Sequence, residues 1–295
     1  MGRKIKEERK NYNMSPQFEA VRKAAIMNRV IKWVVCLGIP LLVVILGIAL
    51  KDGAIAGGGG IFTFIIVHSL WAYLAKNRAL AIFRSMYKRE MITLALNGGV
   101  LYENMTIDYN AGMNPSFVAK SGLLGTDKFF SDCYISGVFN GVQFYQADIR
   151  NVRADSNGQH LEYDGTFIAF PTSLPSATQT NIYHKDVDCS IILPGVNSHI
   201  KIGRKDFDDV FKIATSNKPA VQMLVNDTFM NNLLYVQSLT ERKIAMTVKN
   251  GWVYILMPNK KSVLKPKLFG KYDDTMKNAI IQELCLPQYF INAFR

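Results

Sequence analysis

The stretch Trp33–Leu50 (WVVCLGIPLLVVILGIAL) has 18 residues and no charged side chain, and Ala54–Ala75 (AIAGGGGIFTFIIVHSLWAYLA) has 22, with His68 as its one ionisable group. As helices they would measure about 27 and 33 Å, which brackets a hydrocarbon core of about 30 Å. The polar break at 51–53 is so short that the second helix must return beside the first. The sequence therefore predicts a transmembrane helical hairpin over residues 33–75.

Two other interpretations fit apolar runs near an N-terminus: a buried helical pair of a soluble protein and a cleaved signal peptide. Ala54-Ile55-Ala56 has the small-x-small form of a cleavage site. However, the polar region ahead is long, the first run exceeds the 7–15 residues typical of a signal peptide, and a second run follows directly. Two adjacent runs of spanning length favour the membrane.

Positive charge is concentrated in the first third of the chain. The chain has net charge +12 from 35 Lys+Arg and 23 Asp+Glu, and residues 1–90 hold 15 of the basic and 5 of the acidic residues. The nearly neutral remainder argues against a nucleic-acid partner. Basic residues flank both spans, whereas Lys51 stands alone in the turn between them. Because positive charge stays on the cytoplasmic side, we expect both termini to be cytoplasmic.

Four regions follow from this arrangement. We expect a basic amphipathic segment along the inner leaflet at 1–32, the transmembrane hairpin at 33–75, a cytoplasmic connecting helix at 76–97 and a cytoplasmic domain at 98–295. Ser15-Pro16 predicts the start of a helix within the first segment, with serine as the N-cap and proline in the first turn.

The cytoplasmic domain has strand patterns first and helix patterns later, which favours an α+β fold. We expect a mixed, mainly antiparallel sheet with two or more packed helices. Asn250-Gly251 is the preferred pair for a two-residue type I′ turn and predicts a β-hairpin over Lys243–Met257, with Val248 opposite Val253. One face of this ribbon is wholly apolar and the other is amphipathic, so the apolar face should cover a core.

Weaker signals predict further elements. A second hairpin is expected around Asn140-Gly141. Strands are expected at Gly165–Phe170, Tyr183–Leu193 and Val210–Thr215. A helix over Pro219–Leu239 could restart at Asn226 or Asp227, and a helix over Asp273–Leu286 should stop before Pro287.

No catalytic or cofactor motif stands out in the sequence, and no cofactor is expected. His184, Asp186 and Asp188 would share one face of a predicted strand, and an imidazole with two carboxylates is a plausible set of metal ligands. A solvated polar face explains the same pattern without an ion. The three residues therefore remain a weak metal candidate, and no metal site is assigned.

Basic residues near the membrane are candidates for binding its anionic surface. Three follow the second span and four follow the ribbon: Arg84, Lys88, Arg89, Lys260, Lys261, Lys265 and Lys267. Each such charge near an anionic bilayer contributes about 1 kcal/mol of attraction. An ordinary solvated loop is the alternative interpretation of the four lysines.

Small residues mark the start of the second span. Gly53 and Gly57 have GxxxG spacing, and Gly57–Gly60 is an unbroken run of glycines. Such residues let helix backbones approach closely in lipid, so a homo-oligomer formed through this span is one expected assembly. A flexible start to the second helix is the alternative.

Five stretches recur in a recognisable order: Asp132–Gly137 (DCYISG), Tyr163–Phe170 (YDGTFIAF), Phe207–Thr215 (FDDVFKIAT), Met223–Leu234 (MLVNDTFMNNLL) and the ribbon Lys243–Met257. With the basic N-terminus and the two apolar runs, their order and spacing resemble an uncharacterised bacterial group, domain-of-unknown-function family 3137. The resemblance covers most of the chain after residue 15. It implies a two-pass protein of the bacterial inner membrane, and the family offers no activity or site to carry over.

Together these features predict a membrane-anchored, non-enzymatic cytoplasmic module. Its expected partners are the lipid bilayer, through the anionic inner-leaflet surface, and a membrane or cytoplasmic protein. The alternative is a membrane-tethered enzyme with a site that the sequence does not reveal.

Overall fold

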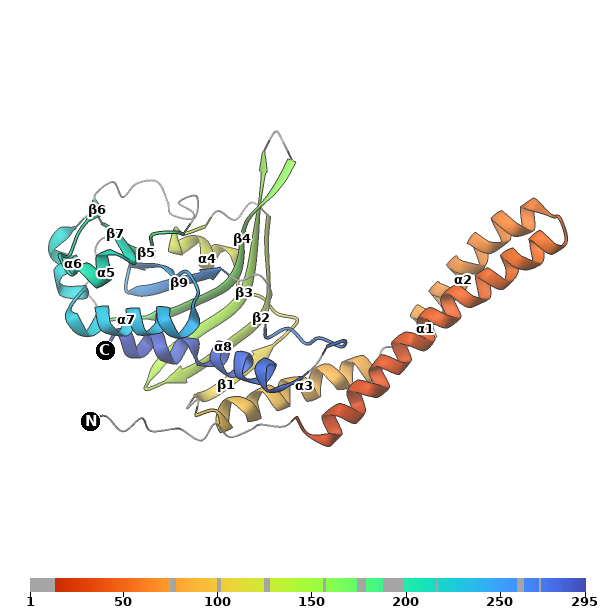
Figure 1. The fold of residues 1–295 in the computed structure, drawn as a ribbon, viewed down its shortest axis with the longest axis horizontal. Helices are drawn as coiled ribbons and strands as arrows, with labels where there is room; N and C mark the ends of the chain where they lie inside the picture. The colour runs from red at the N-terminus through yellow and green to blue at the C-terminus, as the bar shows by residue number, and fades with distance from the viewer. Residues whose placement is uncertain are drawn as a thin grey trace. The chain divides into compact units, whose positions relative to one another are not determined.

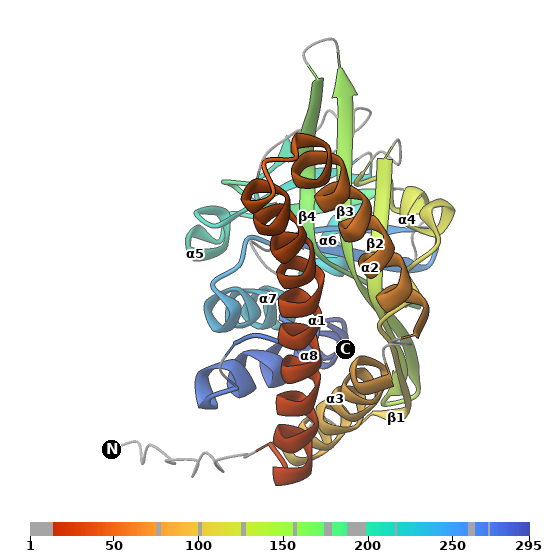
Figure 2. The same cartoon turned by 90° about the vertical axis from the view of Figure 1, so that its right-hand side faces the viewer.

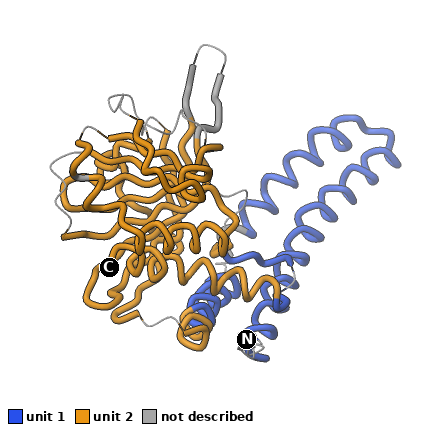
Figure 3. Tube along the Cα trace, turned by 60° about the vertical axis from the view of Figure 1, so that its left-hand side comes forward, with its two compact units in different colours: residues 1–91, 266–274 blue, residues 92–265, 275–295 orange. Residues whose placement is uncertain are grey.

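The computed structural model describes residues 14–74, 78–99, 102–124, 128–155, 158–173, 179–187, 199–215, 217–258, 263–270 and 272–295. The fold is α+β, as predicted. The chain forms two compact units that are discontinuous in sequence (Figure 3). Unit 1 comprises Met1–Met91 and Pro266–Asp274, and unit 2 comprises Ile92–Lys265 and Thr275–Arg295.

Unit 1 begins with α1 (Pro16–Ala49), a single continuous helix of 34 residues (Figure 1). Ser15 is its N-cap, as predicted, and the Ser15 hydroxyl accepts the N–H of Phe18 at 3.2 Å. A helix of this length measures about 51 Å. The described part of the segment expected along the inner leaflet and the apolar run from Trp33 thus belong to one helix.

A π-helix, η1 (Ile55–Gly59), and α2 (Gly60–Leu74) run back along α1 (Figures 1 and 2). A Cβ added at Gly60 would come within 2.5 Å of Val44, and one at Gly47 would overlap the backbone of Ala56. By contrast, no atom lies within 4 Å of a Cβ added at Gly53 or Gly57. The close approach of these helices within the chain therefore lies at Gly47 and Gly60, and the homo-oligomer expected through the second span stays a prediction.

Among the described helices, α1 is long and apolar enough to be a membrane span or a signal anchor, and a shorter apolar helix covers Ile55–Trp71. In the most apolar 18-residue stretch of α1, only 17% of the residues are buried. A core helix of a soluble protein would be mostly buried. The interpretation of the two apolar runs as a buried helical pair of a soluble protein therefore does not fit α1 in a single chain.

Unit 2 is built on one nine-stranded antiparallel sheet in the order β1-β2-β3-β4-β9-β8-β5-β7-β6. The strands are β1 (Glu103–Asp108), β2 (Lys128–Phe139), β3 (Val142–Asp155), β4 (Gly158–Pro171), β5 (Thr180–His184), β6 (His199–Ile200), β7 (Phe211–Thr215), β8 (Ala245–Lys249) and β9 (Trp252–Pro258). The remaining helices are α3 (Arg78–Asn97), which continues from unit 1 into unit 2, α4 (Pro115–Ser121), α5 (Lys205–Asp208), α6 (Lys218–Leu224), α7 (Asp227–Thr240) and α8 (Asp274–Ala293). The described strands all pair antiparallel, so the mixed sheet that we expected is not observed.

Both predicted hairpins are confirmed in the expected register. Asn250 and Gly251 have φ of 52° and 75°, as a type I′ turn requires, and Val248 pairs with Val253 across it. The turn at Asn140-Gly141 has the same left-handed geometry. These turns are encoded locally, because asparagine and glycine tolerate positive φ better than other residues.

Helices cover both faces of the sheet (Figure 1). On one face, Val118 of α4 packs into a core with Phe167 and Leu256. On the other, Phe294 of the C-terminal segment packs against Phe170 of β4, with ring centroids 5.5 Å apart. The amphipathic second face of the ribbon β8–β9 is therefore also covered: Thr247 and Tyr254 are buried, whereas Lys249 and Trp252 at its end are half-buried.

Two element boundaries differ from the prediction. The strand expected at Tyr183–Leu193 ends at His184, where the chain turns and the N–H of Val187 donates to the His184 carbonyl at 2.9 Å. Residues 188–198 lie outside the described part of the chain. The predicted helix restart is confirmed, because Asn226 caps α7.

The second difference is at Pro287, where we expected α8 to end but the helix continues to Ala293. Proline has no N–H to donate to the Glu283 carbonyl, and the Gln146 side chain donates to that carbonyl instead, at 3.2 Å. The Tyr102 hydroxyl donates to the Leu284 carbonyl at 2.7 Å and accepts the Gln288 N–H at 3.2 Å. Distant side chains thus satisfy the helix backbone around the proline.

Replacing Gln146 by leucine is expected to destabilise the chain by about 1–3 kcal/mol, because the buried Glu283 carbonyl would lose its donor. Urea unfolding of the full chain in detergent, followed by circular dichroism, measures the change. Gln143→Leu, at a half-buried position of the same strand, is the matched control and should change the stability by less than about 0.5 kcal/mol. Equal effects of the two variants would contradict the role given to Gln146.

Candidate functional site

The weak metal candidate does not form a site in the described residues. His184 ends β5 and Asp186 lies in the following turn, with His184 Nδ1 3.9 Å from Asp186 Oδ2. Asp188 lies outside the described residues. Burial is the main cause that lowers the pKa of His184 below its usual value. The described part of the chain holds no group of three His, Cys, Asp or Glu side chains that could bind a metal.

The predicted basic residues fall on separate elements. Arg84 and Arg89 are exposed on α3, whereas Lys88 between them is half-buried. Lys265 forms an ion pair with Asp132 of the sheet. Lys267 is exposed in unit 1. Lys260 and Lys261 lie outside the described residues.

The basic half of α1 packs in a buried aromatic cluster within unit 1. The ring of Phe18 lies 5.5 Å from that of Phe83 on α3 and 5.4 Å from that of Tyr272, centroid to centroid. Tyr87 of α3 completes the cluster, 5.8 Å from Tyr272. Burial raises the pKa of Tyr272 to about 12. The cluster holds α1, α3 and a distant segment of the chain together.

That segment, Pro266–Asp274, is here named the α1-bound loop. The Tyr272 hydroxyl closes the loop on itself, because it donates to the Lys267 carbonyl at 2.7 Å and accepts the Lys267 N–H at 3.1 Å. Arg22 of α1 donates to the Gly270 carbonyl at 2.5 Å, and its guanidinium carbon lies 5.1 Å from the centre of the Tyr272 ring. Seven residues further along α1, the guanidinium carbon of Arg29 lies 5.6 Å from the centre of the Phe269 ring.

The α1-bound loop therefore lies along α1 on two cation–π contacts. Phe269 remains 55% exposed in this arrangement. Lys267 was part of a sequence-based candidate, but Phe269 and Tyr272 were not. Nothing local in the sequence distinguishes these aromatic residues, because the arginines that they contact lie about 240 residues away.

A groove of about 710 Å³ lies over β2, β3 and β4 in unit 2. Four of its charged side chains form two ion pairs, Lys265 with Asp132 and Arg150 with Asp164, the second at 3.5 Å, and Asp148 also lines it. Phe130 at its edge is 60% exposed. Arg150 and Asp164 are substantially exposed to solvent, so this pair adds little to stability.

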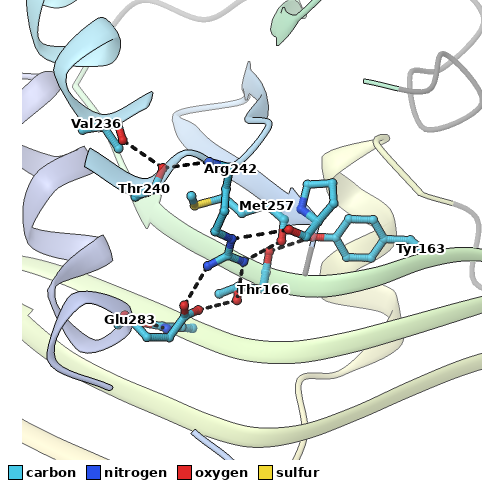
Figure 4. A network of polar contacts seen from close by, with 9 residues as sticks. Tyr163, Thr166, Val236, Thr240, Arg242, Met257 and Glu283 are labelled. Carbon is cyan, nitrogen blue, oxygen red and sulfur yellow. Dashed lines mark hydrogen bonds and ion pairs between the residues drawn. The ribbon is translucent and has the colours of Figure 1, made fainter. Parts of the chain in front are cut away.

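A buried polar network lies next along β4, around Thr166, as Figure 4 shows. Arg242, between α7 and β8, donates to Glu283 of α8 at 2.7 Å, to the Met257 carbonyl of β9 at 2.7 Å and to the Thr166 hydroxyl of β4 at 3.0 Å. The Thr166 hydroxyl in turn donates to the other carboxylate oxygen of Glu283. Strand register places Asp148 of the groove opposite Thr166.

In this network the carboxylate, the guanidinium and the hydroxyl bind one another, with side-chain exposures of 16% for Arg242 and 6% for Glu283. It ties α8 to β4 and β9. Near it, burial is the main cause that raises the pKa of the Cys133 thiol far above its usual value, so this cysteine is held in its neutral form. The arrangement is suited to stabilising the sheet domain.

Comparisons with known proteins support the expected family resemblance for only part of the chain. No curated protein matches the chain. A solved structure, the crystal structure of the mycobacterial trehalose monomycolate transport factor A, TtfA, is 13% identical over 68% of this chain and 94% of that chain, with a TM-score of 0.38. The stretch Asp132–Gly137 and the N-terminal helices lie outside the part of the chain that matches a family. The match to a family covers residues 162–294, which include most of β4 and the elements from β5 to α8. The family is described as "Protein of unknown function (DUF3137)", so this part of the chain is similar to an uncharacterised domain-of-unknown-function family.

Proposed function

We propose that this chain is a membrane-anchored, non-enzymatic module whose basic surface in unit 1 binds the anionic inner leaflet of a bacterial inner membrane. In this proposal α1 and α2 both cross the membrane, and both ends of the chain are cytoplasmic. Unit 2 is then a cytoplasmic domain tethered at that surface.

The observation that carries the proposal is the change of character along α1. From Trp33 onwards its apolar side chains are exposed, for example Val34 at 65% and Leu42 at 66%. Ahead of Trp33 the same helix carries Lys23 and Arg29, both exposed. An apolar surface that continues directly into a basic one is typical of a helix that leaves a membrane through an anionic leaflet.

Cysteine labelling tests the two-pass arrangement in intact cells. Lys51→Cys lies in the exposed turn between α1 and η1, and Gln17→Cys is exposed at the start of α1. In a Cys189→Ser background, a membrane-impermeant maleimide should label Lys51→Cys at once and Gln17→Cys only after permeabilisation. A cytoplasm-active reporter fused after Arg295 should be active. If instead only a periplasm-active reporter fused after Arg295 were active, α1 would cross alone, and the proposal would be overturned.

The composition of co-purified lipid tests binding to the anionic leaflet. Changing Lys23, Arg84 and Lys267 together to glutamine should lower the ratio of phosphatidylglycerol to phosphatidylethanolamine around the purified full chain several-fold, since each charge contributes about 1 kcal/mol of attraction. The matched control changes three exposed lysines of unit 2, Lys201, Lys205 and Lys212. Equal ratios in the wild type and both variants would argue against a specific basic surface.

A further inference from the structure

We propose that the α1-bound loop is itself a membrane contact, with Phe269 inserted at the boundary between lipid headgroups and acyl chains. This inference rests on the proposed function, because it requires α1 to cross the membrane. It adds a lipid-binding element that comes from the C-terminal half of the chain.

The first argument is the position of Phe269 along α1. Its ring stacks on Arg29, and Arg29 precedes Trp33, the start of the apolar run, by four residues or about 6 Å of helix. The polar headgroup layer on each side of a bilayer is about 5–8 Å thick. The stack of Phe269 on Arg29 therefore lies at the level of the headgroups when Trp33 lies at the edge of the hydrocarbon core.

The second argument is the chemistry of the surface around this stack. Phe269 is 55% exposed, and the neighbouring turns of α1 expose Met27 at 60% and Val30 at 45%. Exposed Lys23 and Lys267 belong to the same unit. Large apolar side chains interspersed with lysine and arginine match the headgroup region, where rings enter the acyl boundary and basic groups reach phosphates.

The third argument is that the loop is held in place. The Tyr272 hydroxyl closes the loop, and Arg22 binds the Gly270 carbonyl. Leu268 is buried, and the half-buried Tyr272 ring contacts Phe18 of α1. These contacts hold the described residues on both sides of Phe269 in place. Less conformational entropy is then lost when the ring enters the bilayer than for a flexible loop.

The test places a fluorescent reporter at position 269 of the full chain in nanodiscs. Phe269→Cys, in a Cys189→Ser background, is labelled with an environment-sensitive dye; Cys36, Cys133 and Cys285 are buried. A nitroxide on the upper acyl chain should quench most of the emission, which should be blue-shifted. Gln17→Cys with the same dye is the control, since it lies about 24 Å before Trp33 along α1, and should remain unquenched.

A second variant keeps an aromatic ring on Arg29. Phe269→Trp should add a fluorescence component to that of the wild type, and lipids brominated on the acyl chain should quench it. The inference is overturned if the label and the added tryptophan both behave like the control at position 17. If cysteine labelling still shows two spans in that case, only the inference fails; if α1 does not cross, the proposed function fails as well.

Discussion

Replacing Glu283 by alanine is expected to lower the free energy of unfolding of unit 2 by about 3–5 kcal/mol. The reason is the Arg242 guanidinium, whose side chain is 16% exposed and whose ionic partner at 2.7 Å is Glu283. Without the carboxylate a nearly buried charge would be left uncompensated. Urea unfolding of the full chain in detergent measures the loss.

Two further variants separate this effect from a general loss of packing. Asp164→Asn removes the carboxylate of an exposed ion pair with Arg150 and should cost less than about 1 kcal/mol. The double variant Glu283→Ala with Arg242→Leu removes both buried charges and should recover part of the stability that Glu283→Ala loses. If the double variant were less stable than Glu283→Ala, an uncompensated guanidinium would not be the cause.

Replacing Phe18 by alanine is expected to destabilise unit 1 by about 3–5 kcal/mol, as is typical of removing a fully buried ring. Phe18 is 0% exposed and contacts Phe83, Tyr87 and Tyr272. Loss of its ring should release the α1-bound loop, because Tyr272 would lose one of its two aromatic neighbours. Trypsin should then cleave after Lys267 much faster than in the wild type.

Ile82→Ala is the matched control for this experiment. Ile82 lies on α3 beside Phe83 but is 51% exposed, so its removal creates no cavity in the cluster. We expect its rate of cleavage after Lys267 to equal that of the wild type. Equal cleavage of Phe18→Ala and wild type would contradict the view that the aromatic cluster holds the loop.

Local sequence was sufficient to predict the tight turns and the helix caps. The register of β8 and β9 was predictable because Asn250-Gly251 selects one turn type and the turn sets the pairing. The caps at Ser15 and Asn226 were predictable for a similar reason, since each side chain binds an N–H three residues away.

Local information failed where distant groups replaced local ones. Pro287 is a helix terminator by itself, but Gln146 and Tyr102 supply hydrogen bonds around it, and neither is near it in sequence. The face of the β8–β9 ribbon that contains Thr247 and Tyr254 looked half-polar, yet the α4 side of the sheet buries it. Packing partners decided both outcomes.

The candidate site divides in the same way. The basic candidates were visible in the sequence, because Arg84 follows the second apolar run and Lys267 belongs to the lysine cluster after the ribbon. The loop that binds α1 was not visible, because Arg22 and Arg29 meet Gly270 and Phe269 across about 240 residues of chain. Its two cation–π contacts exist only once the chain has folded.

By itself, the sequence determined the apolar character of 33–75, the concentration of positive charge around it, the α+β class and the two tight turns. Each depends on composition or on neighbours a few residues apart. Tertiary structure alone decided that α8 passes through Pro287, that Arg242, Thr166 and Glu283 form one network, and that Pro266–Asp274 packs on α1. These features join residues that are far apart in the chain, and for such pairs no spacing rule exists until the backbone has brought them together.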